Sequence, residues 1–269
     1  MTTEITIKTA QELRSNVIRN YYRDVRKLRR RLTFKGVEEI AIEIETKLYN
    51  SIFSKKEQPE ISLSDLKSKL YEIHQLLVSD YHSMFAKEVD ALINKVNSFG
   101  YHFASLDIRQ DSRVHHEAFL TLLKGAQKQG VVSKEVDYLQ LDESEKIDFL
   151  TTLKGNLLPE KFSDNLVNKT LGSIRAMQKI QSQNGELGCH RYIISNNQTS
   201  QNIFEVFAMI RLSNWESPSV DVAPLFETIS DLSIAPKVMD VVYSDPTYRN
   251  HLRTSCLLYT SDAADDQAC

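Results

Sequence analysis

The chain has 269 residues, of which 41% are hydrophobic and 26% are charged, a balance typical of a water-soluble protein able to bury a sizeable core. Its formal net charge of -3 produces no overall field that would attract nucleic acid or an anionic membrane. The polar first residues lack the apolar stretch of a secretion signal, and no apolar run is long enough to cross a bilayer. We therefore expect a cytoplasmic protein with no nucleic-acid or membrane partner.

Residues 1–98 carry the apolar periodicity of α-helices. Thr9 and Glu12 have the spacing of a capping box at a helix start. Apolar residues then recur every three or four positions in four stripes, at 13–32, 37–48, 66–77 and 89–96. Gly100 is placed to end the last of these helices. The pattern predicts a helical region at 1–98, and it indicates packing rather than chemistry.

Residues 99–253 follow a different pattern, in which an apolar strand leads into a polar loop and then a helix. The predicted strands are residues 101–108, 191–195 and 220–226. Repeats of this kind predict βα units on a parallel sheet. In such sheets and barrels ligands bind at the carboxyl ends of the strands, where Arg109, Ser195 and Glu227 are expected to lie.

Arg109 and Glu227 are the candidate binding residues at these strand ends. A guanidinium offers a permanent forked donor to phosphate or carboxylate; a structural ion pair of Arg109 with Asp107 or Asp111 is the alternative. A carboxylate at position 227 suits a hard cation; helix capping or an ion pair is the alternative. Position alone favours the structural alternatives.

Other groups of charged or reactive residues give weaker signals. The basic run from Arg23 to Arg31 surrounds an intact apolar stripe without an aromatic stacking platform, which favours a solvated or interdomain face over a nucleic-acid site. His115 and His116 can titrate near neutrality, but no second base or cysteine is close in sequence, so ordinary surface or buried histidines are expected.

The last stretch, residues 254–269, shows neither helical nor strand periodicity. We expect an unstructured tail, or residues foreign to the natural protein. The chain has three cysteines, Cys189, Cys256 and Cys269, and two of them lie in this stretch. Their spacing predicts neither a disulfide framework nor a zinc site.

Three motifs, in this order, resemble the phosphoenolpyruvate carboxylase family. Residues 106–112 (LDIRQDS), followed by His115, are similar to the family's LDIRQES and histidine, with Asp111 where glutamate is common. Residues 192–195 (YIIS) are similar to its YxIS strand, and residues 224–232 (PLFETISDL) to its PLFETxxDL, with a YR pair at 248–249. The resemblance covers roughly residues 5–253.

This resemblance implies an α/β fold with a large helical part: a partial parallel (β/α) barrel elaborated with many α-helices, usually assembled as a homotetramer. It implies a carboxy-lyase that converts phosphoenolpyruvate and bicarbonate into oxaloacetate and phosphate, with Mg²⁺ or Mn²⁺ as cofactor. The reaction fixes carbon dioxide and feeds the tricarboxylic acid cycle. Arg109 matches the family arginine that helps hold the phosphate, and Glu227 one of two acidic metal ligands. Ser195 and His115 match residues of the motifs without an implied binding or catalytic role, and we expect a packing or loop role for them.

The family's HPTE and FHGRGG segments, its two catalytic histidines and its second acidic metal ligand have no counterpart in this sequence. We therefore expect a truncated, inactive piece of a phosphoenolpyruvate carboxylase, with no catalytic residue of its own. Two alternatives stay open: a non-catalytic helical interaction or regulatory subunit that keeps the family scaffold, and another barrel enzyme that uses phosphoenolpyruvate.

Overall fold

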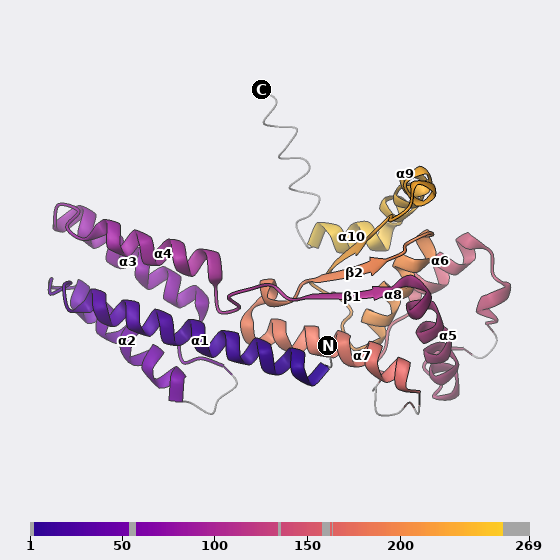
Figure 1. Cartoon of the computed structure of the whole chain (residues 1–269), viewed down its shortest axis with the longest axis horizontal. Helices are drawn as coiled ribbons and strands as arrows, with labels where there is room; N and C mark the ends of the chain where they lie inside the picture. The colour runs from indigo at the N-terminus through magenta and orange to yellow at the C-terminus, as the bar shows by residue number, and fades with distance from the viewer. Residues whose placement is uncertain (1–2, 54–57, 134–135, 158–161, 163, 255–269) are drawn as a thin grey trace, which may run out of the picture. The chain divides into compact units, whose positions relative to one another are not determined.

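The computed structural model describes residues 3–53, 58–133, 136–157, 162 and 164–254, which form two compact units (Figure 1). Of the described residues, the first unit comprises those in Thr3–Ser105 and Lys179–Gly188, and the second comprises those in Leu106–Gln178 and 189–254. The domain boundaries expected from the sequence, after residues 98 and 253, stay predictions. In the described part of the chain, every helix is too short or too polar to span a bilayer.

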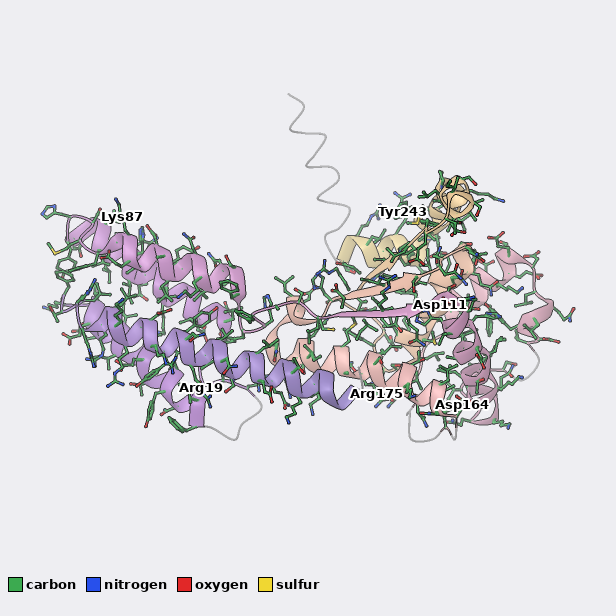
Figure 2. The ribbon with its side chains drawn as sticks, in the orientation of Figure 1. Arg19, Lys87, Asp111, Asp164, Arg175 and Tyr243 are labelled. Carbon is green, nitrogen blue, oxygen red and sulfur yellow. The ribbon has the colours of Figure 1, made fainter. Side chains whose placement is uncertain are left out.

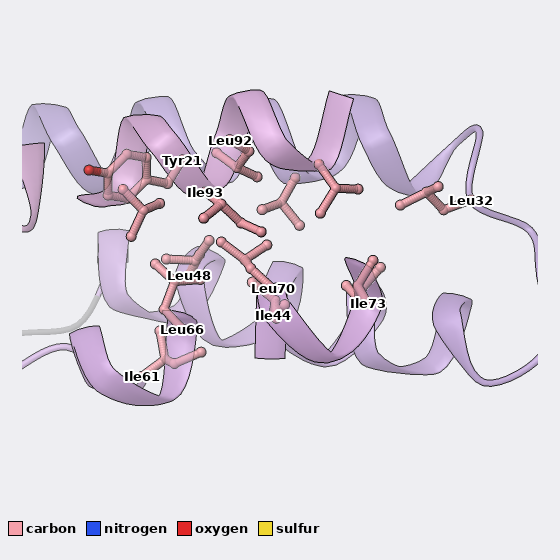
Figure 3. Packing of buried hydrophobic residues seen from close by; sticks show 14 of the residues in the cluster. Tyr21, Leu32, Ile44, Leu48, Ile61, Leu66, Leu70, Ile73, Leu92 and Ile93 are labelled. Atoms are coloured by element: carbon pink, nitrogen blue, oxygen red, sulfur yellow. The ribbon is translucent and has the colours of Figure 1, made fainter. Parts of the chain in front are cut away.

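Four helices make up most of the first unit: α1 Thr3–Arg29, α2 Val37–Phe53, α3 Leu63–Asp80 and α4 Ala86–Phe99. Helix α1 packs against α2 and α4, and α3 packs against the same two helices (Figure 1). The four apolar stripes meet in one core, in which Tyr21, Ile44, Leu70 and Leu92 are buried (Figure 3). Burial of such side chains contributes about 1.5–3 kcal/mol each. The four predicted helices are therefore confirmed.

The ends of these helices differ in part from the sequence prediction. Helix α1 begins at Thr3, so Thr9 lies inside the helix instead of capping it, and it ends at Arg29 although Leu32 is still buried in the helical core. The predicted end of α4 is confirmed: Gly100 has a positive φ of 46°, and its N–H donates to the Val96 carbonyl. Glycine adopts this φ at no steric cost.

The predicted start of the first strand is wrong. Residues 101–104 form a turn, and β1 spans Asp107–Asp111. Tyr101 is buried in the helical core of the first unit, where its hydroxyl donates to the Ile61 carbonyl at 2.9 Å. The apolar character of Tyr101 therefore reflects helix packing rather than a strand. As a consequence, Arg109 lies in the middle of β1 instead of following it.

The second unit contains a parallel sheet of order β1-β2-β3 in its described residues, with β2 at Arg191–Ser195 and β3 at Asp221–Pro224 (Figure 1). Each strand leads into a helix: β1 into α5 Ser112–Lys128, β2 into α8 Ser200–Leu212, and β3 into α9 Ile229–Ser244. The three predicted βα units are confirmed, with β3 shorter than the predicted 220–226. The observed class is helix-rich α/β.

Several elements had no counterpart in the sequence prediction: η1 Tyr138–Gln140, α6 Glu143–Thr152, α7 Asn165–Asn184, η3 Glu186–Gly188 and α10 Pro246–Thr254. Thr254, which the predicted tail included, is the last residue of α10; the rest of that tail, with Cys256 and Cys269, lies outside the described residues. Cys189 is buried, and burial raises the pKa of its thiol to about 12.

The two faces of the sheet differ in burial. Tyr192 and Ile194 of β2 are fully buried, and α5 packs on their face, where His115 Nε2 lies 3.0 Å from the Tyr192 hydroxyl. Arg109, Ile193 and Ala223 form one row across the other face, and they are exposed or partly exposed. Helix packing therefore buries one face, while the row that contains Arg109 is open to solvent.

Candidate functional site

The loops after the three strands are organised by helix N-caps. Asp111, labelled in Figure 2, ends β1 and caps α5 by accepting from the backbone N–H of Arg113. Thr199 and Thr228 are the N-caps of α8 and α9, each in a capping box with the residue three positions on. Such caps satisfy backbone N–H groups that the helix itself leaves unpaired. The polar residues that follow each strand are thus largely explained by helix initiation.

Arg109, in the middle of β1, meets Glu227, which follows β3, although 118 residues separate them in the sequence. Arg109 Nη2 lies 3.0 Å from Glu227 Oε1, and Glu227 Oε2 accepts a 2.8 Å hydrogen bond from the backbone N–H of Asn196. The two side chains are 57% and 41% exposed. An ion pair this exposed contributes about 0–1 kcal/mol, so a charged ligand can separate it at little cost.

The structural alternative for both residues, an ion pair, is present, because Arg109 and Glu227 pair with each other; the partners suggested for Arg109, Asp107 and Asp111, are wrong. Asp107 pairs with Arg191 across β1 and β2 at 3.0 Å, and Asp111 pairs with Arg113 at 2.8 Å. The hydrogen bonds from Arg113 lower the pKa of the Asp111 carboxyl to about 2. Each neighbouring aspartate therefore has a cation of its own, and Arg109 extends to Glu227 instead.

The other two motif residues occupy different environments. Ser195 is the last residue of β2 and lies opposite Asp111 in the register. His115 is fully buried against Tyr192, and burial lowers its pKa to about 4. A histidine that is neutral and enclosed in this way serves packing, which agrees with the role expected of it.

Two features at or near the sheet were missed by the sequence reasoning. Asn196 adopts a left-handed backbone conformation, with φ 53°; the signal for it is an asparagine directly after a strand, since asparagine tolerates this conformation. Glu205 is completely buried in α8 and accepts hydrogen bonds from Tyr138, at 2.9 Å, and from His116. The signal for this cluster is a carboxylate within an apolar helix face.

The basic run from Arg23 to Arg31 covers the end of α1 and the residues just after it. Arg26 and Arg29 pair with Glu45 of α2, and Arg31 pairs with Glu88 of α4 at 3.9 Å. Two carboxylates of neighbouring helices thus pair with three of the cations in this run, which favours a solvated face over a nucleic-acid site.

Glu227 is the candidate ligand for a divalent cation. Carboxylate oxygen is the donor type that Mg²⁺ and Mn²⁺ prefer, and Mg²⁺ commonly uses one or two carboxylates together with waters and substrate oxygens. In the ranges that the structure describes, no three His, Cys, Asp or Glu side chains are placed to share a metal ion. The donor type fits, and the chain supplies one such carboxylate.

Comparison with known proteins identifies the family. A family model described as phosphoenolpyruvate carboxylase matches residues 42–266, a stretch that includes Arg109 and Glu227. The chain is 31% identical over 200 residues to the phosphoenolpyruvate carboxylase of Parasynechococcus marenigrum, covering 71% of this chain and 19% of that protein. It is 31% identical over 175 residues to that of Gloeobacter violaceus, covering 62% and 18%.

A third relative gives the same picture. The phosphoenolpyruvate carboxylase of Rhodopseudomonas palustris is 30% identical over 202 residues, with 71% of this chain and 21% of that protein covered. The chain thus spans about one fifth of the length of these relatives. Because the family model matches well over half of the chain, the chain belongs to the phosphoenolpyruvate carboxylase family.

Proposed function

We propose that this chain forms part of a phosphoenolpyruvate carboxylase, the carboxy-lyase that joins phosphoenolpyruvate and bicarbonate to give oxaloacetate and phosphate. The observation that carries the proposal is the 3.0 Å contact of Arg109 with Glu227 in a chain of this family. A cationic phosphate ligand and an anionic metal ligand must lie close together to bind the same substrate. Their mutual pairing provides that proximity.

Arg109 is the proposed phosphate ligand. Its guanidinium is permanently charged and forked, so it can donate two parallel hydrogen bonds to phosphate oxygens. In the proposed reaction bicarbonate attacks the phosphorus, the bond to the enol oxygen breaks, and carboxyphosphate and the enolate of pyruvate form. Arg109 would neutralise the phosphoryl oxygens during this transfer, where preorganised positive charge is most effective.

Glu227 is the proposed ligand of Mg²⁺ or Mn²⁺. When bound, such a cation supplies positive charge beside the oxygen on which negative charge develops. Glu227 is suited to hold it because its side chain is 41% exposed and its carboxylate is fixed through Oε2 by the Asn196 backbone. Separation from Arg109 frees Oε1 without loosening the side chain.

The sheet is proposed to be part of a (β/α) barrel. Parallel strands of order β1-β2-β3, helices packed on the Tyr192 face and an accessible row on the Arg109 face are the arrangement expected of a barrel segment. The proposal further includes catalytic histidines in family segments that this chain does not supply, a homotetramer in the cytoplasm, and oxaloacetate delivery to the tricarboxylic acid cycle. The family match does not favour the non-catalytic alternative.

Titration calorimetry of the 269-residue chain with phosphoenolpyruvate, with and without Mg²⁺, tests this function. We expect binding that depends on Mg²⁺, and Arg109→Gln should weaken it by about tenfold or more, because hydrogen bonds to charged groups contribute about 1.5–3 kcal/mol. The chain alone should form no oxaloacetate.

Arg191→Gln is the matched control for this titration. Arg191 also makes a 3.0 Å ion pair on the sheet, with Asp107, but it is the first residue of β2 and therefore lies at the amino end. Its replacement should leave the affinity unchanged. Equal affinities of the parent chain and Arg109→Gln would contradict the proposed function.

A further inference from the structure

Asn196 has an uncommon backbone conformation at the candidate site. It follows β2 directly and has a positive φ of 53°. Residues other than glycine rarely adopt such values, although asparagine does so more readily than most. Uncommon backbone conformations that persist next to binding residues often contribute to the geometry of the site.

The peptide groups of Asn196 contact both neighbouring βα junctions. Its N–H donates to Glu227 Oε2, after β3, at 2.8 Å. Its carbonyl accepts a 2.6 Å hydrogen bond from the hydroxyl of Ser112, the first residue of α5. Ser112 itself is only 3% exposed. The Asn196 backbone therefore connects the start of α5 to the Glu227 carboxylate.

The adjacent backbone continues the pairing of β2 with β3. The N–H of Leu225 donates to the Ile194 carbonyl at 2.8 Å, and the N–H of Asn197 donates to the Leu225 carbonyl at 3.0 Å. Asn197 itself is fully buried. These bonds hold the segment that carries Glu227 beside Asn196, so the direction of the Asn196 N–H decides where the carboxylate rests.

We propose that Asn196 is a positioning residue for Glu227, an inference that rests on the proposed role of Glu227 as a cation ligand. The two oxygens of the carboxylate have different partners: a backbone N–H, which cannot move away, holds Oε2, and a flexible arginine side chain holds Oε1. When Arg109 turns to another anion, Oε2 stays fixed and Oε1 becomes available. The left-handed turn at Asn196 thus presents one carboxylate oxygen in a defined direction.

Substitutions at position 196 separate the backbone conformation from the side chain. Asn196→Gly keeps the N–H and accepts the left-handed conformation, whereas Asn196→Val disfavours it, because a β-branched residue with positive φ is strained. The probe is Mn²⁺, whose binding to the 269-residue chain is followed by electron paramagnetic resonance of the free ion. We expect Asn196→Gly to bind as the parent does and Asn196→Val to bind about tenfold more weakly, as residues that orient metal ligands typically do when replaced.

Asn214→Val is the matched control for a general folding defect. Asn214 is also left-handed, with φ 62°, but it lies after the C-terminal end of α8, where its N–H donates to the Gly155 carbonyl at 2.8 Å. Its replacement should lower the melting temperature and leave Mn²⁺ affinity unchanged. A loss of affinity equal to that of Asn196→Val would overturn the inference, since a structural role alone would then explain both.

Glu227→Gln distinguishes failure of the inference from failure of the proposed function. If Glu227→Gln binds Mn²⁺ like the parent, the proposed ligand is wrong and the inference falls with it. If Glu227→Gln loses binding while folded Asn196→Val retains it, the positioning role alone is refuted. Should Asn196→Val fail to melt cooperatively, Ser112→Ala decides: weaker Mn²⁺ binding supports the role, and unchanged binding overturns it.

Discussion

His115 and His116 are neighbours on α5, yet their side chains meet opposite electrostatic conditions. His115 is fully buried against Tyr192, and burial lowers its pKa to about 4. His116 lies 2.7 Å from the buried carboxylate of Glu205, and the hydrogen bond to that carboxylate raises its pKa. Burial therefore favours the neutral form of His115, whereas the Glu205 carboxylate favours the charged form of His116.

This pair predicts a maximum of stability near the ordinary histidine pKa of about 6.5. Below that pH His115 is protonated in the unfolded chain, whereas in the folded chain it stays neutral down to about pH 4. Lowering the pH therefore favours unfolding. Above it, folded His116 keeps its proton longer than the unfolded chain does, and its stabilisation is lost as pH rises through its raised pKa. Urea unfolding over a pH series measures the free energy of unfolding on both sides of the maximum, the acid limb below it and the alkaline limb above it.

His116→Gln is the informative variant for this pH dependence. It should flatten the alkaline limb and leave the acid limb in place, because it removes the titrating partner of Glu205 and does not touch His115. An alkaline limb of unchanged slope in this variant would refute the assignment. His251 adds to the acid limb, since burial lowers its pKa as well.

At the scale of single elements, α9 depends strongly on its N-terminal cap. Thr228 accepts from the N–H of Asp231 at 3.1 Å, and Asp231 accepts from the N–H of Thr228 at 3.0 Å. Pro236 lies inside the helix and has no N–H, so one internal hydrogen bond is missing. The turns before Pro236 therefore rely on the capping box, and they follow directly on Glu227.

Thr228→Ala should destabilise the second unit by about 1 kcal/mol, the usual cost of losing an N-cap side chain. Chemical denaturation followed by circular dichroism measures this change. Ser233→Ala is the control: its hydroxyl donates to the Ser230 carbonyl within the same helix, and an exposed change of this kind should stay within about 0.5 kcal/mol. Equal effects of the two substitutions would show that the cap does not stabilise α9.

At the scale of the whole molecule, each compact unit has buried apolar residues of its own. Helices α1 to α4 enclose one continuous core, and the second unit buries Phe119, Ile174, Ile203 and other side chains beneath its sheet and helices. Units with separate cores can open with different free energies, because opening one need not expose the apolar residues of the other.

Leu70→Ala tests this separation. Leu70 is only 2% exposed in the helical core, and its truncation should cost about 2–5 kcal/mol. Hydrogen exchange should accelerate in α1 to α4 and stay unchanged in α5 and α8. The control Val78→Ala, on the exposed side of the same helix, should leave both the stability and the exchange rates unchanged. Faster exchange throughout the chain in Leu70→Ala would instead indicate one cooperative unit.

Local patterns were sufficient for much of the architecture. The four helical stripes, the end of α4 at Gly100 and the three βα units follow from periodicity and capping, which depend on residues a few positions apart. The motifs around Arg109 and Glu227 indicated the family because each is a short run of consecutive residues, which can be compared without knowledge of the fold. The predicted start of β1 was wrong because Tyr101 is buried in the helical core. A local pattern does not distinguish an apolar residue of this kind from one in a strand.

Only the tertiary structure decided how the candidate site is assembled. The contact of Arg109 with Glu227 spans 118 residues, and the bond from Asn196 to Glu227 depends on the register in which β2 pairs with β3. Glu205 likewise finds His116 and Tyr138 only after α5, η1 and α8 have packed. The sequence by itself determined which elements form and their order, because these are short-range properties; which side chains meet was decided by strand register and helix packing, which are set by the whole fold.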